Sequence, residues 1–502
     1  MLFRSMLRGV VGRVRLGRRF VTSLLWSAAW GGIAAGSGLA GPGSDDISVP
    51  ALTADEQRVL QTIEQGDVLA TISFLASDEL AGRDTPSKEL EIAGAYVASR
   101  FRGAGLEGAG PDGSFYQVQE LPRYFAPEGS PALLTAAQPQ GVSGCIAVSG
   151  GDAVAELRGP VLSDAAGVEL RGAIVVIEEP PLPPAAAENS AMAGLSLARR
   201  VAPLAARGAA AVLVRVAGDG VLWPAMQRLR AEGTALPQQL SFPVVLVPAE
   251  ADLTGEVQLS VPPRRRVAEQ VRNVVGVLRG TDPKLSAEAI IITAHLDHIG
   301  RIAGDRQGDT IYNGADDNAT GVTAVVTLAE AFGRLQPRPA RSVVFMTFWG
   351  EEKGLLGSKA WCEQPLWPLE KTVANVNIEM IGRPEEGAAE KMWGTGWTRS
   401  TLGPQLAAGA KRAGVEVFHR EDVSEMLYAR SDNYSFVQKG VIAHSFSAGS
   451  LHQDYHQLTD EYTRLNLPHM TRIIQGLFAG SLPLARGDLT PTKTAAAKAG
   501  KQ

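Results

Sequence analysis

The sequence predicts an α/β protein whose main domain has three layers, with a largely parallel sheet between two layers of helices. Beyond residue 288, short apolar runs alternate with segments of helical periodicity, the pattern of strands joined by crossover helices. Residues 289–294 are continuously apolar, as expected of a parallel strand buried on both faces. Residues 122–263 are rich in Ala and Val, with Gly and Pro bounding each apolar run, which predicts an inserted β-rich domain.

Composition narrows the function classes. The chain has 502 residues, of which 45% are hydrophobic and 20% charged, so it is too long for one ordinary domain and too apolar to be disordered. A net charge of −5 argues against a dedicated nucleic-acid surface. Two cysteines, Cys145 and Cys362, exclude a disulfide framework and a thiolate zinc site, and the sequence leaves open whether they pair. Any metal must therefore be held by His, Asp and Glu.

The first forty residues have the pattern of a secretory signal peptide. Six arginines and no acid lie in the first twenty positions, followed by an apolar stretch at 20–35 and a small-residue exit at 38–40. Such a stretch is marginal for a membrane span, and an uncleaved anchor stays open as the alternative. We therefore expect an exported protein (periplasmic, cell-surface or extracellular) whose mature chain does not insert stably into a membrane. Residues 41–55 are predicted to be a linker.

The remaining elements follow in order. Residues 56–121 are predicted to give the main domain helices near 60–72 and 92–101. The insert, 122–263, has predicted strands at 173–177, 210–216 and 241–247 and a helix at 196–207. In the rest of the main domain, 264–486, predicted strands at 289–294, 342–348, 373–380 and 441–446 alternate with helices at 319–335, 355–362, 406–412 and 470–478. The basic run 262–266 is predicted to be a solvated linker, and 487–502 a disordered tail.

Polar residues follow the predicted strands of the main domain, at the edge where parallel sheets place functional loops. His295 and Asp297 are two apart, so an extended chain puts both side chains on one side. Such a carboxylate can hold the ring of a metal-bound histidine. Asp316 and Asp317 open a helix between two glycines, which is more than helix capping requires.

Three more segments carry residues of the same type. Glu351 and Glu352 follow the strand at 342–348, and adjacent buried carboxylates need a nearby cation. Glu379 interrupts an apolar strand end, where a metal ion or Arg383 could supply its partner. His456 lies on the loop before the last helix.

Together these segments predict a metal site. Five segments spread over about 160 residues each deliver a ligand-type residue, two histidines and several carboxylates in all. This set suits a hard or borderline divalent ion, zinc first, with enough ligands for two ions bridged by one carboxylate. The signatures His-Glu-x-x-His, Gly-x-Ser-x-Gly and the phosphate loop are absent from the sequence.

Taken in order, the motifs resemble the di-zinc exopeptidases of the bacterial leucyl aminopeptidase, glutamate carboxypeptidase and transferrin-receptor superfamily. The resemblance covers 295–456 and extends weakly to 75–106, where Ser-Asp-Glu-Leu-Ala-Gly-Arg at 77–83 resembles the family's N-terminal helix and loop. It implies a phosphorylase/hydrolase-like zinc-exopeptidase domain. Residues 122–263 resemble a protease-associated (PA) domain inserted into it.

The resemblance also implies the metal ligands. His295 and Glu379 would bind one zinc, Glu352 and His456 the other, and Asp316 would bridge both, with a cis peptide bond between Asp316 and Asp317. Many relatives have Asp at the position of Glu379, which can still ligate through its longer side chain.

The remaining roles are implied in the same way. Asp297 would orient His295, and Glu351 would be the general base. Tyr428 resembles the tyrosine that polarises the scissile carbonyl, with Tyr455 as its rival. Relatives often have His at the position of Asn433, to which no role is assigned. For three further histidines, packing or solvent exposure is the better prediction: His298, His444 and His452.

The implied function is an exported zinc exopeptidase acting on peptides, first an aminopeptidase in which Glu351 activates a metal-bridging water. A carboxypeptidase would need a cationic pocket, for which Arg430 and Arg383 are candidates. A glutaminyl cyclase shares the fold but normally uses one zinc. A non-catalytic receptor-like binding protein would be expected to have lost ligands, whereas every ligand position here is filled.

Overall fold

The computed structural model describes residues 47–164, 169–182, 190–217, 220–231, 242–301, 308–449 and 451–494. The predicted signal peptide lies outside these residues. Among the helices that are described, none has the length and apolar character needed to cross a membrane.

The main sheet has nine strands, and its centre is parallel, as predicted. The order is β1 (Glu107–Gly108), β10 (Arg265–Leu278), β14 (Ser342–Phe348), β11 (Ala289–His295), β15 (Thr372–Ile378), β18 (Ala443–Ser447), β16 (Lys391–Gly394) and β17 (Glu416–His419), and β2 (Tyr116–Phe125) pairs with β10. Strands β14, β11, β15 and β18 run parallel. Their carboxyl ends therefore meet at one edge of the sheet.

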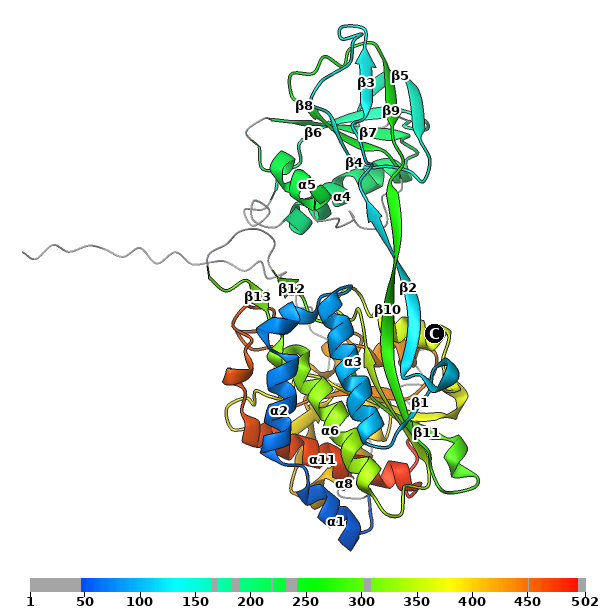
Figure 1. The fold of residues 1–502 in the computed structure, drawn as a ribbon, viewed down its shortest axis with the longest axis vertical. Coiled ribbons are helices and arrows are strands. Elements are labelled where there is room, and N and C mark those ends of the chain that lie inside the picture. The colour runs from blue at the N-terminus through cyan, green and yellow to red at the C-terminus, as the bar shows by residue number, and fades with distance from the viewer. Residues whose placement is uncertain are drawn as a thin grey trace, which may run out of the picture. The chain divides into compact units, whose positions relative to one another are not determined.

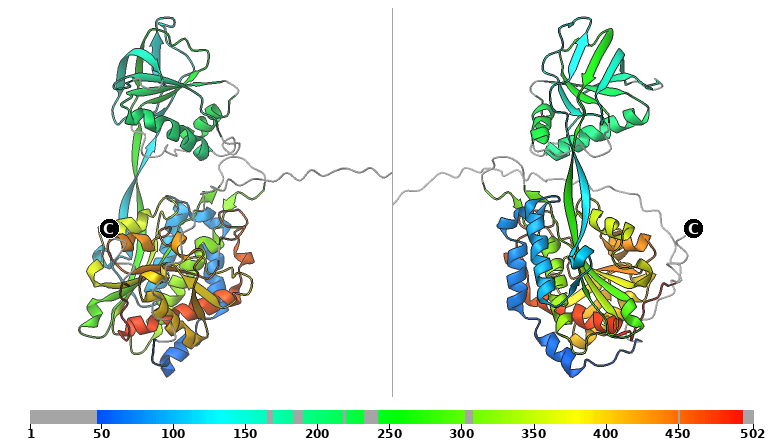
Figure 2. Two further views of the ribbon diagram at one scale, coloured as in Figure 1. Left: turned by 180° about the vertical axis from the view of Figure 1, so that it is seen from behind. Right: turned by 45° about the vertical axis from the view of Figure 1, so that its right-hand side comes forward.

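Helices cover both faces of this sheet, which confirms the three-layer prediction. One face packs on α2 (Gln65–Leu75), α3 (Lys88–Gly103), α6 (Thr320–Arg334), α8 (Leu402–Ala410) and α11 (Leu467–Arg486). The other packs on α7 (Leu356–Glu363) and α10 (Asn433–Gln438). Ile290 and Ile292 enter the first core and Ile291 the second, because successive side chains of a strand point to opposite faces. Figure 1 shows α2 and α3 beside α6, and Figure 2 shows the sheet between its helical layers.

The N-terminal helices differ slightly from the prediction. The expected helix at 60–72 is two helices, α1 (Ala54–Gln61) and α2, with the chain extended at Glu64 between them. Thr53 and Glu56 form a capping box that starts α1.

The insert has its own sheet and two cores. Its seven strands run in the order β3 (Ala132–Thr135), β9 (Glu256–Val261), β5 (Ala155–Ser163), β6 (Ile174–Glu178), β7 (Ala211–Val216), β8 (Val244–Pro248) and β4 (Ile146–Ser149). Two helices, α4 (Ser190–Ala206) and α5 (Leu222–Ala231), pack on one face. Its identity as a PA domain stays a prediction.

Cys145 in this insert and Cys362 in α7 are both free and buried.

Strands β2 and β10 form a long antiparallel ribbon on either side of the insert in sequence, paired from Tyr116–Val274 to Phe125–Arg265 (Figure 1). The predicted boundary at residue 122 therefore falls inside a strand. The basic run is also better ordered than a solvated linker. Arg264 lies 2.6 Å from Asp152 and its guanidinium stacks on Tyr124, at 3.8 Å from the ring centroid.

The prediction of a disordered tail from residue 487 is wrong for residues 487–494, while 495–502 lie outside the described residues. Buried Arg341 donates to the carbonyls of Leu484 and Leu489 at 2.9 and 2.8 Å and to the Thr490 hydroxyl at 2.7 Å. The composition of the tail does not predict these hydrogen bonds to Arg341.

Replacing Arg341 with Met should therefore destabilise the main domain. Several buried acceptors would lose their donor, at a cost on the order of 1–3 kcal/mol each if left unpaired. We expect a clear fall in the midpoint of thermal unfolding, whereas Lys284→Met, at an exposed site, should leave it nearly unchanged. Equal midpoints for the two variants would show that the Arg341 hydrogen bonds do not stabilise the main domain.

Candidate metal centre

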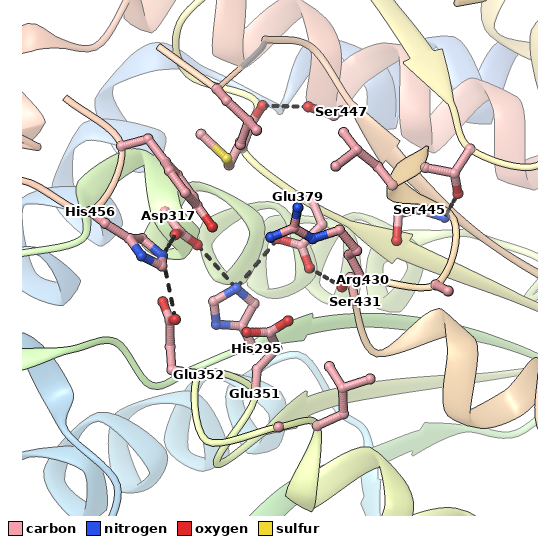
Figure 3. A pocket seen from close by; sticks show the side chains of 18 of the residues that line it. His295, Asp317, Glu351, Glu352, Glu379, Arg430, Ser431, Ser445, Ser447 and His456 are labelled. Carbon is pink, nitrogen blue, oxygen red and sulfur yellow. Dashed lines mark hydrogen bonds and ion pairs between the residues drawn. The ribbon is translucent and has the colours of Figure 1, made fainter. Parts of the chain in front are cut away.

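The polar residues that follow the parallel strands converge on one cavity of about 360 Å³. His295 is the last residue of β11 and lies in register with Phe348, the last of β14, so the loop carrying Glu351 and Glu352 starts beside it. Glu379 directly follows β15. All four line the cavity together with Asp317 and His456 (Figure 3).

One group gathers around His295. Its Nε2 lies 3.2 Å from Oδ1 of Asp317 and 3.4 Å from Oε2 of Glu379. Zinc ligands at about 2.0–2.2 Å from a tetrahedral ion are separated by roughly 3.3–3.6 Å, so the spacing of these three atoms fits a zinc ion.

A second group gathers on the other oxygen of Asp317. Its Oδ2 lies 3.0 Å from Nε2 of His456, which is 3.4 Å from Oε2 of Glu352. Asp317 thus contributes one oxygen to each group and is the shared member (Figure 3).

The structure corrects the bridging residue by one position. Asp316 does not join the cluster: its Oδ1 accepts from the Gly382 amide at 2.7 Å, and its Oδ2 lies 3.0 Å from Nε2 of His452. The cis peptide bond joins Asp317 and Asn318, so the predicted Asp316–Asp317 cis bond is wrong. The sequence offered two adjacent acids without indicating which of them faces His295.

Asp460 holds the backbone of this segment. Its carboxylate accepts from the amides of Asp316 at 3.0 Å and of Asp317 at 3.1 Å. Burial, together with the charge of Asp316, raises the pKa of Asp460 to about 6, although these amides oppose the rise.

Asp297 takes a different place from the predicted one. Its carboxylate is 3.8 Å from Nδ1 of His295, whereas its main-chain oxygen is only 3.1 Å away. The carboxylate instead accepts from the Thr85 hydroxyl at 3.0 Å and from the Glu351 amide at 3.1 Å. Thr85 also accepts from the Gly350 amide at 3.1 Å. Asp297 therefore connects the first strand end to the loop that carries Glu351.

Arg83 is a second member of this N-terminal segment that the sequence analysis did not assign. It is 1% exposed and donates to the carbonyls of Leu296, Asn313 and Gly314 at 2.9, 2.8 and 3.0 Å. Burial lowers its pKa to about 10, opposed by the nearby carboxylates, so it is a buried cation at neutral pH. The only available signal was its place in the weak N-terminal resemblance.

Two hydrogen bonds to Oε1 hold the Glu379 carboxylate in place. Its Oε1 accepts from the Ser431 hydroxyl at 2.5 Å and from Nδ2 of Asn377 at 3.1 Å. Asn377 also donates to Ser445 at 2.9 Å, and Ser445 donates to Asn433 at 2.9 Å. Asn433, left without a role, is thus part of this supporting network.

Glu351 lies in an environment that opposes its ionisation. Burial and the charges of Asp432, Glu379 and Glu352 raise its pKa well above the usual range, although His295 acts against them. Asp432 is itself 0% exposed, and burial raises its pKa to about 7.

The structure separates the two candidate tyrosines. Tyr455 lines the cavity, and its ring stacks on His456 with centroids 3.9 Å apart. Tyr428 is buried, with its ring centroid 5.7 Å from that of His444 and 4.6 Å from the guanidinium of Arg399. Tyr428 is not among the residues that line the cavity, whereas Tyr455 is.

The residues present fit a divalent metal. Nε2 of His456 and Oε1 of Glu352 are buried and lack a hydrogen-bond partner among the described residues, although carboxylates and imidazoles surround them. Ligand-type atoms that lie close together without hydrogen-bond geometry are expected where a metal ion binds between them. Imidazole with carboxylate suits zinc among the common ions.

Three-layer architecture and this histidine–carboxylate centre define the class of metal-dependent α/β hydrolases. The sequence model of peptidase family M28 matches residues 273–479 of this chain. A probable glutamate carboxypeptidase of Arthroderma benhamiae is 35% identical over 112 residues, 22% of this chain and 14% of that protein. A probable zinc metalloprotease of Pyrenophora teres f. teres is 31% identical over 123 residues, 24% of this chain and 25% of that protein.

The chain thus spans at most a quarter of the length of these two curated relatives. Among solved structures, the zinc aminopeptidase BSAP of Bacillus subtilis aligns with a TM-score of 0.51 at 17% identity, over 85% of this chain and 96% of that chain. This likeness supports the fold.

Thr85 provides a test of how the Glu351 loop is held. Thr85→Val keeps the shape but removes the hydroxyl between Asp297 and Gly350. A displacement of about 1 Å at a reacting group can cost on the order of 100-fold in rate. For a reaction catalysed at this centre, we expect kcat to fall at least about tenfold with little change in bound metal, and Thr85→Ser to retain most of it. Equal activity of the Val and Ser variants would show that the hydroxyl is not needed.

Proposed function

We propose that the chain is a zinc-dependent exopeptidase with two ions, first an aminopeptidase that removes N-terminal residues from peptides. One observation carries the proposal: Asp317 offers one oxygen to a His295–Glu379 group and the other to a His456–Glu352 group, beside a half-buried Glu351. Export remains part of the proposal, based on the N-terminal sequence.

In this proposal His295, Glu379 and Asp317 hold one ion, and His456, Glu352 and Asp317 hold the other. When bound, such ions lower the pKa of a water molecule and polarise the scissile carbonyl. Ser431 and Asn377 keep the Glu379 carboxylate in place, which limits the geometries that this ligand can adopt.

Glu351 is proposed to move the proton. It lines the cavity and is not needed as a ligand in either group. Its raised pKa suits a base that takes a proton from the attacking water and returns it to the leaving amine. Asp297 fixes its loop through the Glu351 amide.

Tyr455 is proposed to stabilise the oxyanion. Burial raises the pKa of its hydroxyl above the usual range, so the group stays protonated and can donate a hydrogen bond. Its ring is fixed by stacking on His456.

The lining of the cavity supports an exopeptidase. Carboxylates of Glu351, Glu352 and Glu379 attract the ammonium group of a free N-terminus. An apolar wall can receive the side chain of the terminal residue; it is formed by Leu355, Met380, Trp393, Leu427 and Leu451.

Glu351→Gln tests the base directly. We expect turnover of an aminoacyl anilide to fall by about two to four orders of magnitude, because the amide cannot accept the proton. Metal content, measured on the purified variant, should stay at the wild-type value. A comparable loss of metal would contradict the assignment of Glu351 as base and not ligand.

A second candidate function is carboxypeptidase, and Arg430 favours it. Of the two candidate arginines, Arg383 forms an ion pair with Asp454. Asp454 also pairs with Arg464 at 3.1 Å. Arg430 is exposed, lines the cavity, and its side chain extends toward Glu379 in Figure 3. Its guanidinium could bind a substrate carboxylate.

Arg430→Gln distinguishes the two candidates. A carboxypeptidase should lose affinity for peptides with a free C-terminus, raising KM about tenfold or more, because one charged hydrogen bond is worth about 1.5–3 kcal/mol. An aminopeptidase should show the same KM as wild type for a short peptide and for its C-terminal amide. Hydrolysis of N-blocked peptides, and only of those, by the wild type would favour the carboxypeptidase.

A further inference from the structure

We propose that His298 is a ligand of the second ion, so that this ion is held by two imidazoles, His298 and His456, with Glu352 and Asp317. The inference rests on the proposed metal centre and extends it by a residue that the sequence analysis predicted to be packing or solvent-exposed. It assigns Nδ1 of His298 as the ligating atom.

The position of Nδ1 supports this role. It lies 2.8 Å from Oε1 of Glu352 and 3.9 Å from Oδ2 of Asp317. These three residues form a set whose ligand-type atoms all lie within 4.8 Å of one another. The ring also meets that of His456 edge-on, with centroids 5.6 Å apart.

The contact with Glu352 is not a hydrogen bond. Nδ1 of His298 and Oε1 of Glu352 both lack a hydrogen-bond partner among the described residues, although they are 2.8 Å apart. His298 is 0% exposed, so its ring is closed off from bulk solvent. Two ligand-type atoms that approach closely without alignment are expected to share a third partner, and a cation suits both a carboxylate and an imidazole nitrogen.

The fold holds the ring in this place. The His298 amide donates to the carbonyl of Arg83 at 3.2 Å, which fixes the backbone. On the other side, a Cβ at Gly314 would lie 2.4 Å from Cγ of His298, so only glycine leaves room for the ring. Arg83 in turn binds the carbonyl of Gly314 at 3.0 Å. Arg83 and Gly314 therefore fix the position of the His298 ring, whose nitrogens have no hydrogen-bond partner among the described residues.

The test is His298→Asn, because the Asn side chain keeps a polar group in this buried position but lacks the imidazole nitrogen. His444→Asn is the matched control, since His444 is equally buried (1% exposed) but hydrogen-bonds Ser400 instead. Each metal-free protein is titrated with Zn²⁺, and its unfolding midpoint is measured to confirm that it folds. Relative to wild type, we expect His298→Asn to bind one of the two ions at least about tenfold more weakly. His444→Asn should bind both ions with wild-type affinity.

A second readout counts the ligands. With Co²⁺ in both sites, each ligating imidazole keeps one ring N–H whose proton resonance is strongly shifted and exchanges with solvent. Three such resonances are expected in wild type and two in His298→Asn. Two resonances in both proteins, with unchanged Zn²⁺ affinities, would overturn the ligand role. If wild type itself binds fewer than two ions, the proposed metal centre fails instead, and the two failures are thereby distinguished.

Discussion

The repulsion among carboxylates at one edge of the sheet is the constraint on which the site depends. Asp317, Glu351, Glu352 and Glu379 line a single cavity, and Asp297 and Asp432 are buried close behind it. Negative charges this close oppose one another's ionisation unless cations lie among them. The buried guanidinium of Arg83 supplies part of that charge, and two metal ions would supply the rest. The chain is therefore built to bind cations at this edge.

Convergence itself follows from strand topology. Because β14, β11 and β15 are parallel and adjacent, residues just beyond their ends come together whatever the loops do. The N-terminal segment then joins these loops from outside the sheet. Arg83 binds carbonyls of Leu296 and Gly314 in the connection after β11, and Thr85 links Asp297 of that connection to the Gly350 amide after β14. The segment 83–85, more than 200 residues away in sequence from the strand ends, is thus part of the site.

The strand-end logic explains what the sequence could and could not predict. Continuous apolar runs indicated the central strands, and β14 begins and ends at the predicted residues. Position at a strand end is enough to bring His295, Glu351, Glu352 and Glu379 to one cavity. Choosing Asp317 over Asp316 requires the local backbone path, including the cis bond after Asp317, which composition does not encode. The sequence could not decide between Tyr455 and Tyr428, because only the structure shows which of them lines the cavity. His298 was set aside because a single histidine usually packs, and its orphaned ring is visible only in three dimensions.

The two halves of the centre differ in ways that bear on how ions bind. Around His295 the side chains are 2–15% exposed, so an ion there would be enclosed. Around Glu352 the His456 side chain is 34% exposed, and the ring stacks on Tyr455 at the cavity wall. An ion in this second half is reached through the same opening that a substrate would use. Additional imidazole ligation by His298 from the buried side would offset that exposure, because it anchors the ion where solvent cannot compete. The second half would then bind its ion firmly while one face stays open to the reacting groups, as a catalytic metal site requires.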